Sequence, residues 1–159
     1  MKRAVSLLTA LMIVVAGSRP VQASTPVINA QIFGIELCPQ FICGAAFFTG
    51  FLGGQVGANP AAFGTFLVAI THQELPPDAD GQAALTGGVF EIRVGLRRIR
   101  GQVPSGTLTN DGNNTFTVQA VLTIANGGGD TYFCGILNHN VFPPTIIGAI
   151  TQVPVDCTP

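Results

Sequence analysis

Two histidines, His72 and His139, are the side chains of this sequence best suited to acid–base chemistry, because an unperturbed imidazole titrates near neutral pH. They stand in similar segments: FLVAITHQELPP ends at Pro77, FCGILNHNVFPP ends at Pro144, and the two align without gaps. A catalytic residue seldom needs a structural twin, whereas a residue that caps a strand end before prolines would be copied with its hairpin. We therefore expect structural caps, with a polar site as the alternative. An enzyme would need a pocket that brings one histidine against a carboxylate.

Other catalytic patterns are absent from the sequence. After residue 23 the only serines are Ser24 and Ser105, and neither lies in a nucleophile motif such as G-x-S-x-G. The eight acidic residues are scattered, which gives no signature of paired carboxylates. We predict no catalytic residue and no cofactor.

Three acids close in sequence, Glu74, Asp78 and Asp80, precede Gly81 and look like a fragment of a calcium loop. The chain then continues with QAALTG, where a full loop would supply another oxygen ligand and a bidentate glutamate. A solvated turn is the simpler interpretation, and a weak metal site is the alternative.

All arginines beyond residue 23 lie in EIRVGLRRIRG and are Arg93, Arg97, Arg98 and Arg100. They could bind an anionic ligand, or they could guard an edge strand against aggregation. Strand periodicity puts Arg93 and Arg97 on one face and Arg98 and Arg100 on the other. A bulge near Gly95 would then be needed to gather all four.

The first 23 residues have the features of a secretory signal peptide. Lys2 and Arg3 precede an apolar run over residues 4–16, and VQA ends at Ala23. The run is too short for a comfortable membrane span. We predict cleavage before Ser24, a single domain over residues 24–159, no membrane span after processing, and a secreted location, periplasmic if the source is Gram-negative.

All four cysteines, Cys38, Cys43, Cys134 and Cys157, lie in the part predicted to be exported, where an even number indicates two disulfides. Proximity in sequence favours Cys38 with Cys43 and Cys134 with Cys157, and a crossed pairing stays open. In a closed meander we expect all four to gather at one pole.

Charge is scarce in this chain, at 9% of residues. Removal of Lys2, Arg3 and Arg19 with the signal leaves four arginines against eight acids, a formal charge of −4. This balance does not favour nucleic acid as a partner. We expect an extracellular ligand or self-association.

Period-two alternation predicts an all-β domain, and it is clearest in TFTVQAVLTIA, where Phe116, Val118, Ala120, Leu122 and Ile124 share the predicted inner face. Explicit turn sequences separate the strands, and NDGNN at residues 110–114 supplies residues that tolerate positive φ in a tight hairpin. The expected strands form an antiparallel meander of about eight, folded as a small barrel or sandwich from two related halves, with the repeat at about 63–85 and 130–152. They run over residues 27–37, 46–56, 63–72, 82–94, 98–109, 115–125, 131–138 and 146–155.

From this pattern we expect a secreted, non-enzymatic binding or structural module. The alternatives are a calycin-like carrier of a small apolar ligand and an uncharacterised barrel hydrolase or isomerase. An interior plugged by Phe47, Phe66, Phe116 and Phe133 would exclude a carrier, whereas an open apolar mouth of a few hundred Å³ would favour one.

Overall fold

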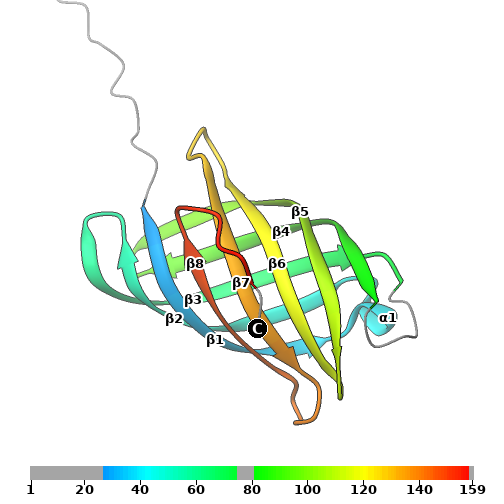
Figure 1. The fold of residues 1–159 in the computed structure, drawn as a ribbon. Helices are drawn as coiled ribbons and strands as arrows, with labels where there is room; N and C mark the ends of the chain where they lie inside the picture. The colour runs from blue at the N-terminus through cyan, green and yellow to red at the C-terminus, as the bar shows by residue number, and fades with distance from the viewer. Residues whose placement is uncertain (1–26, 75–80, 158–159) are drawn as a thin grey trace, which may run out of the picture.

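Eight antiparallel strands close into a barrel in the computed structural model, which describes residues 27–74 and 81–157 (Figure 1). Each strand pairs with its neighbours in the chain, and β8 closes the sheet against β1. The predicted all-β meander is thus confirmed, and of the two architectures left open it is the barrel. The strands are β1 (Ile28–Cys38), β2 (Ala46–Val56), β3 (Asn59–His72), β4 (Gln82–Val94), β5 (Arg97–Gly112), β6 (Thr115–Ile124), β7 (Asp130–Asn138) and β8 (Thr145–Thr151).

Alternation of apolar and polar residues forms these strands, because successive side chains point to opposite faces. In β6 four of the five residues predicted for the inner face are buried: Val118, Ala120, Leu122 and Ile124. Phe116 is half-buried, and Thr117, predicted for the outer face, is buried too. Turns follow the predicted chemistry as well: Asn113 and Asn114 both adopt positive φ, at 50° and 55°, between β5 and β6.

The last strand is shorter than predicted. It ends at Thr151, whose hydroxyl donates to the carbonyl of Val153, and the chain then leaves the sheet. The predicted strand had continued to Val155 because the apolar alternation does so. This early end lets the following residues run back outside the barrel wall.

Large rings fill the barrel interior over glycines in neighbouring strands. Phe66 packs where a Cβ on Gly34 would lie 2.5 Å from its Cζ, and Phe133 packs in the same way against Gly148. Only a cavity of about 50 Å³ remains between them, lined by apolar side chains. Two other residues expected in this plug lie elsewhere: Phe47 is half-buried in a hollow of the outer wall, and Phe116 lines the hollow at one end of the barrel.

The two hairpins that carry the histidines differ beyond their first strands. Phe66 pairs with Ile92, whereas Phe133 pairs with Ile150. If the second hairpin kept the register of the first, the partner of Phe133 would be Pro159, which follows Ile92 by the same number of residues as Phe133 follows Phe66. The predicted equivalence of the hairpins is therefore wrong past His72 and His139.

At one end of the barrel, which we call the mouth, β1, β3, β5 and β7 end and β2, β4, β6 and β8 begin. The short helix α1 (Gln40–Cys43) lies there between β1 and β2 (Figure 1). Among the described residues, no helix is long and apolar enough to cross a membrane.

Candidate functional site

The mouth of the barrel is hollowed into a cup of about 650 Å³. Its floor is apolar, with Phe48, Ile70, Leu108, Val118 and Leu137 among the lining residues. Its polar lining consists of Glu36, Gln40, His72, Glu74 and His139. The cup thus joins an apolar floor to a few polar side chains, which is the usual composition of a small-molecule site.

A carboxylate and an imidazole meet at the rim of this cup. His139 Nε2 lies 2.9 Å from Glu36 Oε2, and the Glu36 side chain is only 4% exposed. Glu36 occupies the inner face of β1, and His139 follows β7, so the contact bridges the start of β8. The backbone amide of Glu36 donates to the carbonyl of Pro144 at 2.8 Å, which fixes β1 against the β7–β8 connection.

The imidazole of His139 is held from other sides too. Its backbone amide donates to the carbonyl of Asn114 at 2.9 Å, and its ring meets Phe116 edge-on with the centroids 5.2 Å apart. Glu36 Oε2 forms no hydrogen bond of regular geometry with the described residues, so the short distance to Nε2 is a charge contact. A proton on Nε2 would face this carboxylate and leave the lone pair on Nδ1, because a carboxylate only accepts hydrogen bonds. Within residues 27–74 and 81–157, no hydrogen bond to His139 Nδ1 is seen.

His72 stands on the other side of the mouth, because β3 and β7 are four strands apart in a closed ring of eight. Its Nδ1 lies 2.6 Å from the carbonyl oxygen of Gln73. The Gln40 amide bonds both its backbone groups, accepting from His72 N at 2.7 Å and donating to His72 O at 2.8 Å. His72 therefore contacts backbone, as a strand cap does, whereas His139 contacts a carboxylate.

Glu36 was missed by the sequence analysis, although a signal was present. The inner row of β1 runs Ile28, Ala30, Ile32, Gly34 and Glu36, so strict alternation places this acid inside the barrel. An acid at an inward position is unusual, because burying a charge costs several kcal/mol unless it is paired.

The arginines do not reach the cup. Glu91 on the outer face of β4 bonds Arg93 and Arg100, and Arg98 Nε lies 3.5 Å from Glu91 Oε1. These arginines gather without the bulge predicted near Gly95, because the β4–β5 turn places Arg93 opposite Arg98 and Glu91 opposite Arg100. Hydrogen bonds from Arg100 and then Arg93 hold the pKa of Glu91 below its ordinary value. Arg97 lies apart, against Gly57.

The weak metal site is not built by the described residues. Asp78 and Asp80 lie outside them, and Glu74 is exposed at the rim of the cup. Residues 27–74 and 81–157 contain no group of three histidine, cysteine or acidic side chains that could hold a metal ion.

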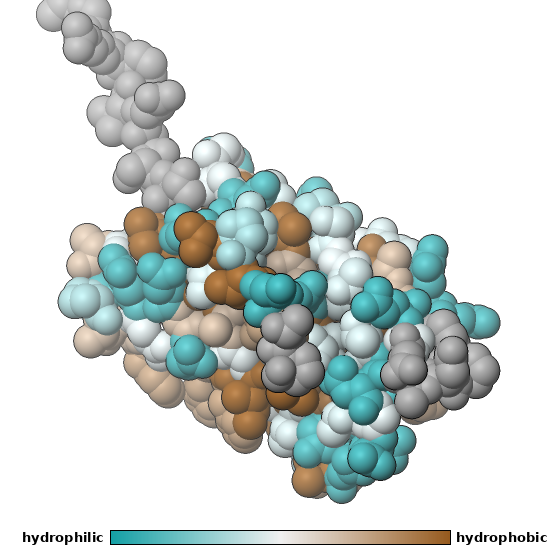
Figure 2. Space-filling view, in the orientation of Figure 1, coloured by the Kyte–Doolittle hydropathy of each residue, from teal (hydrophilic) through white to brown (hydrophobic). Residues whose placement is uncertain are grey.

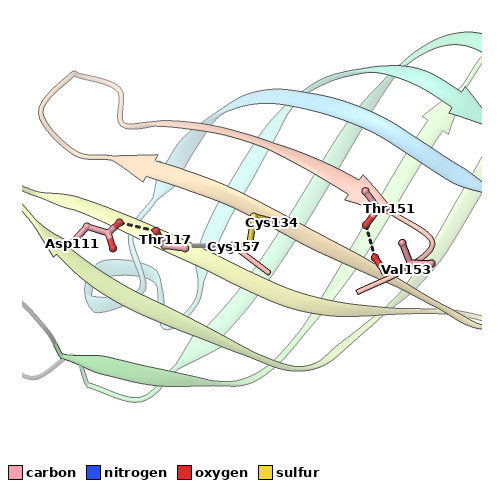
Figure 3. The surroundings of a disulfide bond; sticks show 6 residues. All are labelled: Asp111, Thr117, Cys134, Thr151, Val153 and Cys157. Carbon is pink, nitrogen blue, oxygen red and sulfur yellow. Dashed lines mark hydrogen bonds between the residues drawn. A yellow bond between two sulfur atoms is a disulfide. The ribbon is translucent and has the colours of Figure 1, made fainter. Parts of the chain in front are cut away.

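Both favoured disulfides form, Cys38–Cys43 and Cys134–Cys157. The first closes the loop that carries α1 at the mouth. The second lies on the outer wall beside the hydrogen bond from Thr117 to Asp111 (Figure 3). Cys134 pairs with Ala149 in the middle of the sheet, so the cysteines do not gather at one pole; β8 ends early and Cys157 returns along the wall.

The outer wall also exposes a row of apolar side chains. Ile136, Ile147, Phe33 and Phe51 are successive partners across β7, β8, β1 and β2, and each is about half exposed. Phe63 stacks on Phe51 with ring centroids 5.7 Å apart. Figure 2 shows hydrophobic residues over β1 and β2 on this face. We call these five residues the apolar row.

No protein-family profile, curated protein or solved structure matches this chain. The function must therefore be argued from the cup and the wall themselves.

Proposed function

We propose that this protein binds a small, mostly apolar ligand in the mouth of its barrel, as an extracellular carrier or ligand-binding module. The observation that carries the proposal is the open cup of about 650 Å³, which falls within the usual size range of small-molecule pockets. Below it, Phe66 and Phe133 leave only about 50 Å³. The ligand therefore sits in the mouth above a phenylalanine floor and does not thread the barrel.

The lining indicates the ligand's chemistry. An apolar body fits against Phe48 and Phe116, and one polar group of the ligand meets the Glu36–His139 pair at the rim. A cup with a buried carboxylate disfavours ligands that carry a negative charge at that point, because like charges repel strongly where water is excluded. A neutral ligand with one polar group is the best match.

An extracellular location is part of this proposal. The two disulfides support it, because they persist in oxidising compartments. The segment predicted as a signal peptide lies outside the described residues. Mass spectrometry of exported protein should give Ser24 as the first residue; material that retains residues 1–23 and stays with the membrane would contradict export.

Binding is tested with N-phenyl-1-naphthylamine, a neutral apolar dye whose fluorescence rises in apolar sites. We expect the dye to bind the mature protein and to shift the NMR amide signals of Gly44, Phe116 and Leu137 in the cup. Shifts confined to Phe33 and Ile147 on the outer wall would contradict a site in the mouth.

A matched pair of variants sharpens this test. Phe116→Ala removes a ring from the cup, whereas Phe51→Ala removes an equal ring from the outer wall. Burial of a phenylalanine side chain against a ligand is worth about 1.5–3 kcal/mol, so Phe116→Ala should weaken binding roughly tenfold or more. Phe51→Ala should leave the affinity unchanged. Equal effects of the two variants would refute the site.

Self-association is a second candidate, favoured by the apolar row. The row crosses five strands, from β7 through β8, β1 and β2 to β3, and stacks Phe63 on Phe51. Because a closed barrel has no free strand edge for pairing, a second copy would bind through an exposed apolar face such as this one. We expect sedimentation velocity to show a dimer that Phe33→Ser converts to monomer. A wild-type protein that is monomeric at its highest soluble concentration would exclude this role.

A further inference from the structure

We propose that the Glu36–His139 pair is a general-base site that moves a proton between two carbons of an apolar carbonyl compound bound in the cup. His139 is the catalytic residue, and Glu36 is the positioning residue. The inference rests on the proposed function, because the same cup must bind the substrate, and it adds a reaction to that binding.

The geometry of the pair is that of a base with its orienting acid. Glu36 Oε2 is buried and lies 2.9 Å from His139 Nε2, and it makes no hydrogen bond of regular geometry with the described residues, so the imidazole is its nearest polar group and the two atoms hold the ring toward the carboxylate. In the proposed mechanism the Nε2 proton faces this oxygen. Phe116 packs edge-on against the ring, and the bond to the carbonyl of Asn114 anchors its backbone. What remains is Nδ1 with its lone pair, on a side chain that lines the cup and is one-third exposed.

The lining limits the chemistry available. Among the described residues of the cup there is no serine or threonine hydroxyl, cysteine thiol, tyrosine phenol or lysine amine. Covalent catalysis by such a nucleophile is therefore not offered by this lining. Proton transfer by imidazole requires none of them and no second reactant.

The step is an isomerisation that balances within the substrate and the imidazole. His139 Nδ1 takes a proton from the carbon next to the carbonyl; the C–H electron pair forms a C=C bond, and the carbonyl π pair moves to oxygen. The imidazolium carries the proton, and the Glu36 carboxylate stabilises its charge. In an unsaturated ketone, the proton then returns to the far carbon of the conjugated system, which restores the carbonyl and shifts the double bond.

The apolar floor favours this reaction. Phe48, Leu137 and Val118 offer no hydrogen-bonding side chain to water near the base, and an electrostatic contact such as the carboxylate–imidazolium pair strengthens as the local dielectric falls. A general base positioned in this way typically contributes about 10²–10⁴-fold to a rate.

The test uses 2-indanone, a small neutral ketone with acidic C–H bonds, incubated with mature protein in D₂O. Deuterium entering the ketone is followed by proton NMR, and binding is followed by displacement of N-phenyl-1-naphthylamine. At ketone concentrations that displace the dye fully from each protein, we expect the wild type to exchange the ketone at least about 100-fold faster than His139→Gln. Equal exchange by the two proteins would overturn the proposal.

Glu36→Gln tests the positioning role against the matched control Glu91→Gln, which alters a carboxylate on the outer wall. Glutamine can donate to Nε2 and so reverse the tautomer, and we expect exchange to fall at least about tenfold at ketone concentrations that displace the dye fully. The ¹⁵N shifts of the His139 ring should show a lone pair on Nδ1 in the wild type and its loss in Glu36→Gln. Glu91→Gln should match the wild type in both respects. A wild-type ring protonated on Nδ1 alone would refute the mechanism.

The outcomes separate this inference from the proposed function. If the dye does not bind, the ligand-binding function fails and the inference fails with it. If the dye binds and 2-indanone displaces it without exchange above His139→Gln, the binding function stands and the base site is wrong. If the ketone does not displace the dye, the substrate class is wrong.

Discussion

Replacing Gly148 with alanine should destabilise the barrel strongly, because a Cβ at this position of β8 would clash with the backbone of β7 and with the ring of Phe133. A Cβ at this position would lie 2.3 Å from the carbonyl oxygen of Cys134, 2.6 Å from Cε2 of Phe133 and 2.7 Å from Cα of Gly135. Two of these three atoms belong to the backbone of β7. Relief therefore requires the strands to separate by about 1 Å, since ordinary contacts begin near 3.4 Å.

The cost should reach the upper part of the overpacking range, about 3 kcal/mol, because a closed sheet cannot shift one strand without straining the next. With a urea m-value of about 2 kcal/mol/M, the unfolding midpoint should fall by about 1.5 M. Far-UV circular dichroism with the disulfides intact is the appropriate assay.

Gly53→Ala is the matched control for this prediction. A Cβ there would meet nothing within 4 Å, on the outer face of β2. Alanine should be neutral or stabilising by about 0.5–1 kcal/mol, because glycine loses more backbone entropy on folding. If the two variants unfold within about 0.5 kcal/mol of each other, the close contact under Phe133 is not what fixes glycine at position 148.

Three further predictions concern cross-links and charges. In the chain-entropy model, loss of the Cys134–Cys157 bond, with its sequence separation of 23, should lower the free energy of unfolding by about 3 kcal/mol. Loss of the Cys38–Cys43 bond, with its separation of 5, should lower it by about 2 kcal/mol. Urea unfolding curves of variants with both cysteines of a pair replaced by serine measure each value. The pKa of Glu91 is lower in the folded protein than in the unfolded chain, so its ion pairs stabilise the fold fully above the unfolded-state pKa and are lost as pH falls through the folded pKa. Glu91→Gln should therefore lower the urea unfolding midpoint slightly at pH 7 and leave it unchanged in strong acid. The double variant Glu36→Leu/His139→Leu should have a urea unfolding midpoint at or above that of the wild type, and it should lose ketone exchange. The single variant Glu36→Leu, which keeps His139, should be no more stable than the double variant.

The sequence was sufficient for most of the barrel because alternation directly encodes which side chains face inward. Val118, Ala120 and Leu122 were assigned correctly on this basis, and the asparagines of the β5–β6 turn were recognised by their tolerance of positive φ. The end of β8 was missed, because Val153 and Val155 continue the apolar alternation after the backbone has left the sheet. Periodicity describes faces; hydrogen bonds decide where a strand ends.

The candidate site was harder to predict because it depends on contacts between distant strands. The repeat drew attention to His72 and His139 as equivalents, yet their partners differ: a backbone carbonyl for one and Glu36 for the other. The closure of β8 on β1 determines that difference, and no local pattern reports which strands a closed sheet brings together. The inward parity of Glu36 was readable, but its partner was not.

A buried carboxylate is weak support for stability, and this makes Glu36 informative. Burying this carboxylate beside an imidazole costs at least about as much free energy as their contact returns, so apolar residues of similar volume would hold the barrel at least as well. Every other buried residue on the inner row of β1 is apolar or glycine, and the row changes to an acid only at the mouth, where the wall meets the cup. A stable barrel needs no charge there. A site that orients an imidazole toward a bound molecule does, and this asymmetry along a single strand is the strongest reason to look for function at the mouth and not on the arginine-rich outer wall.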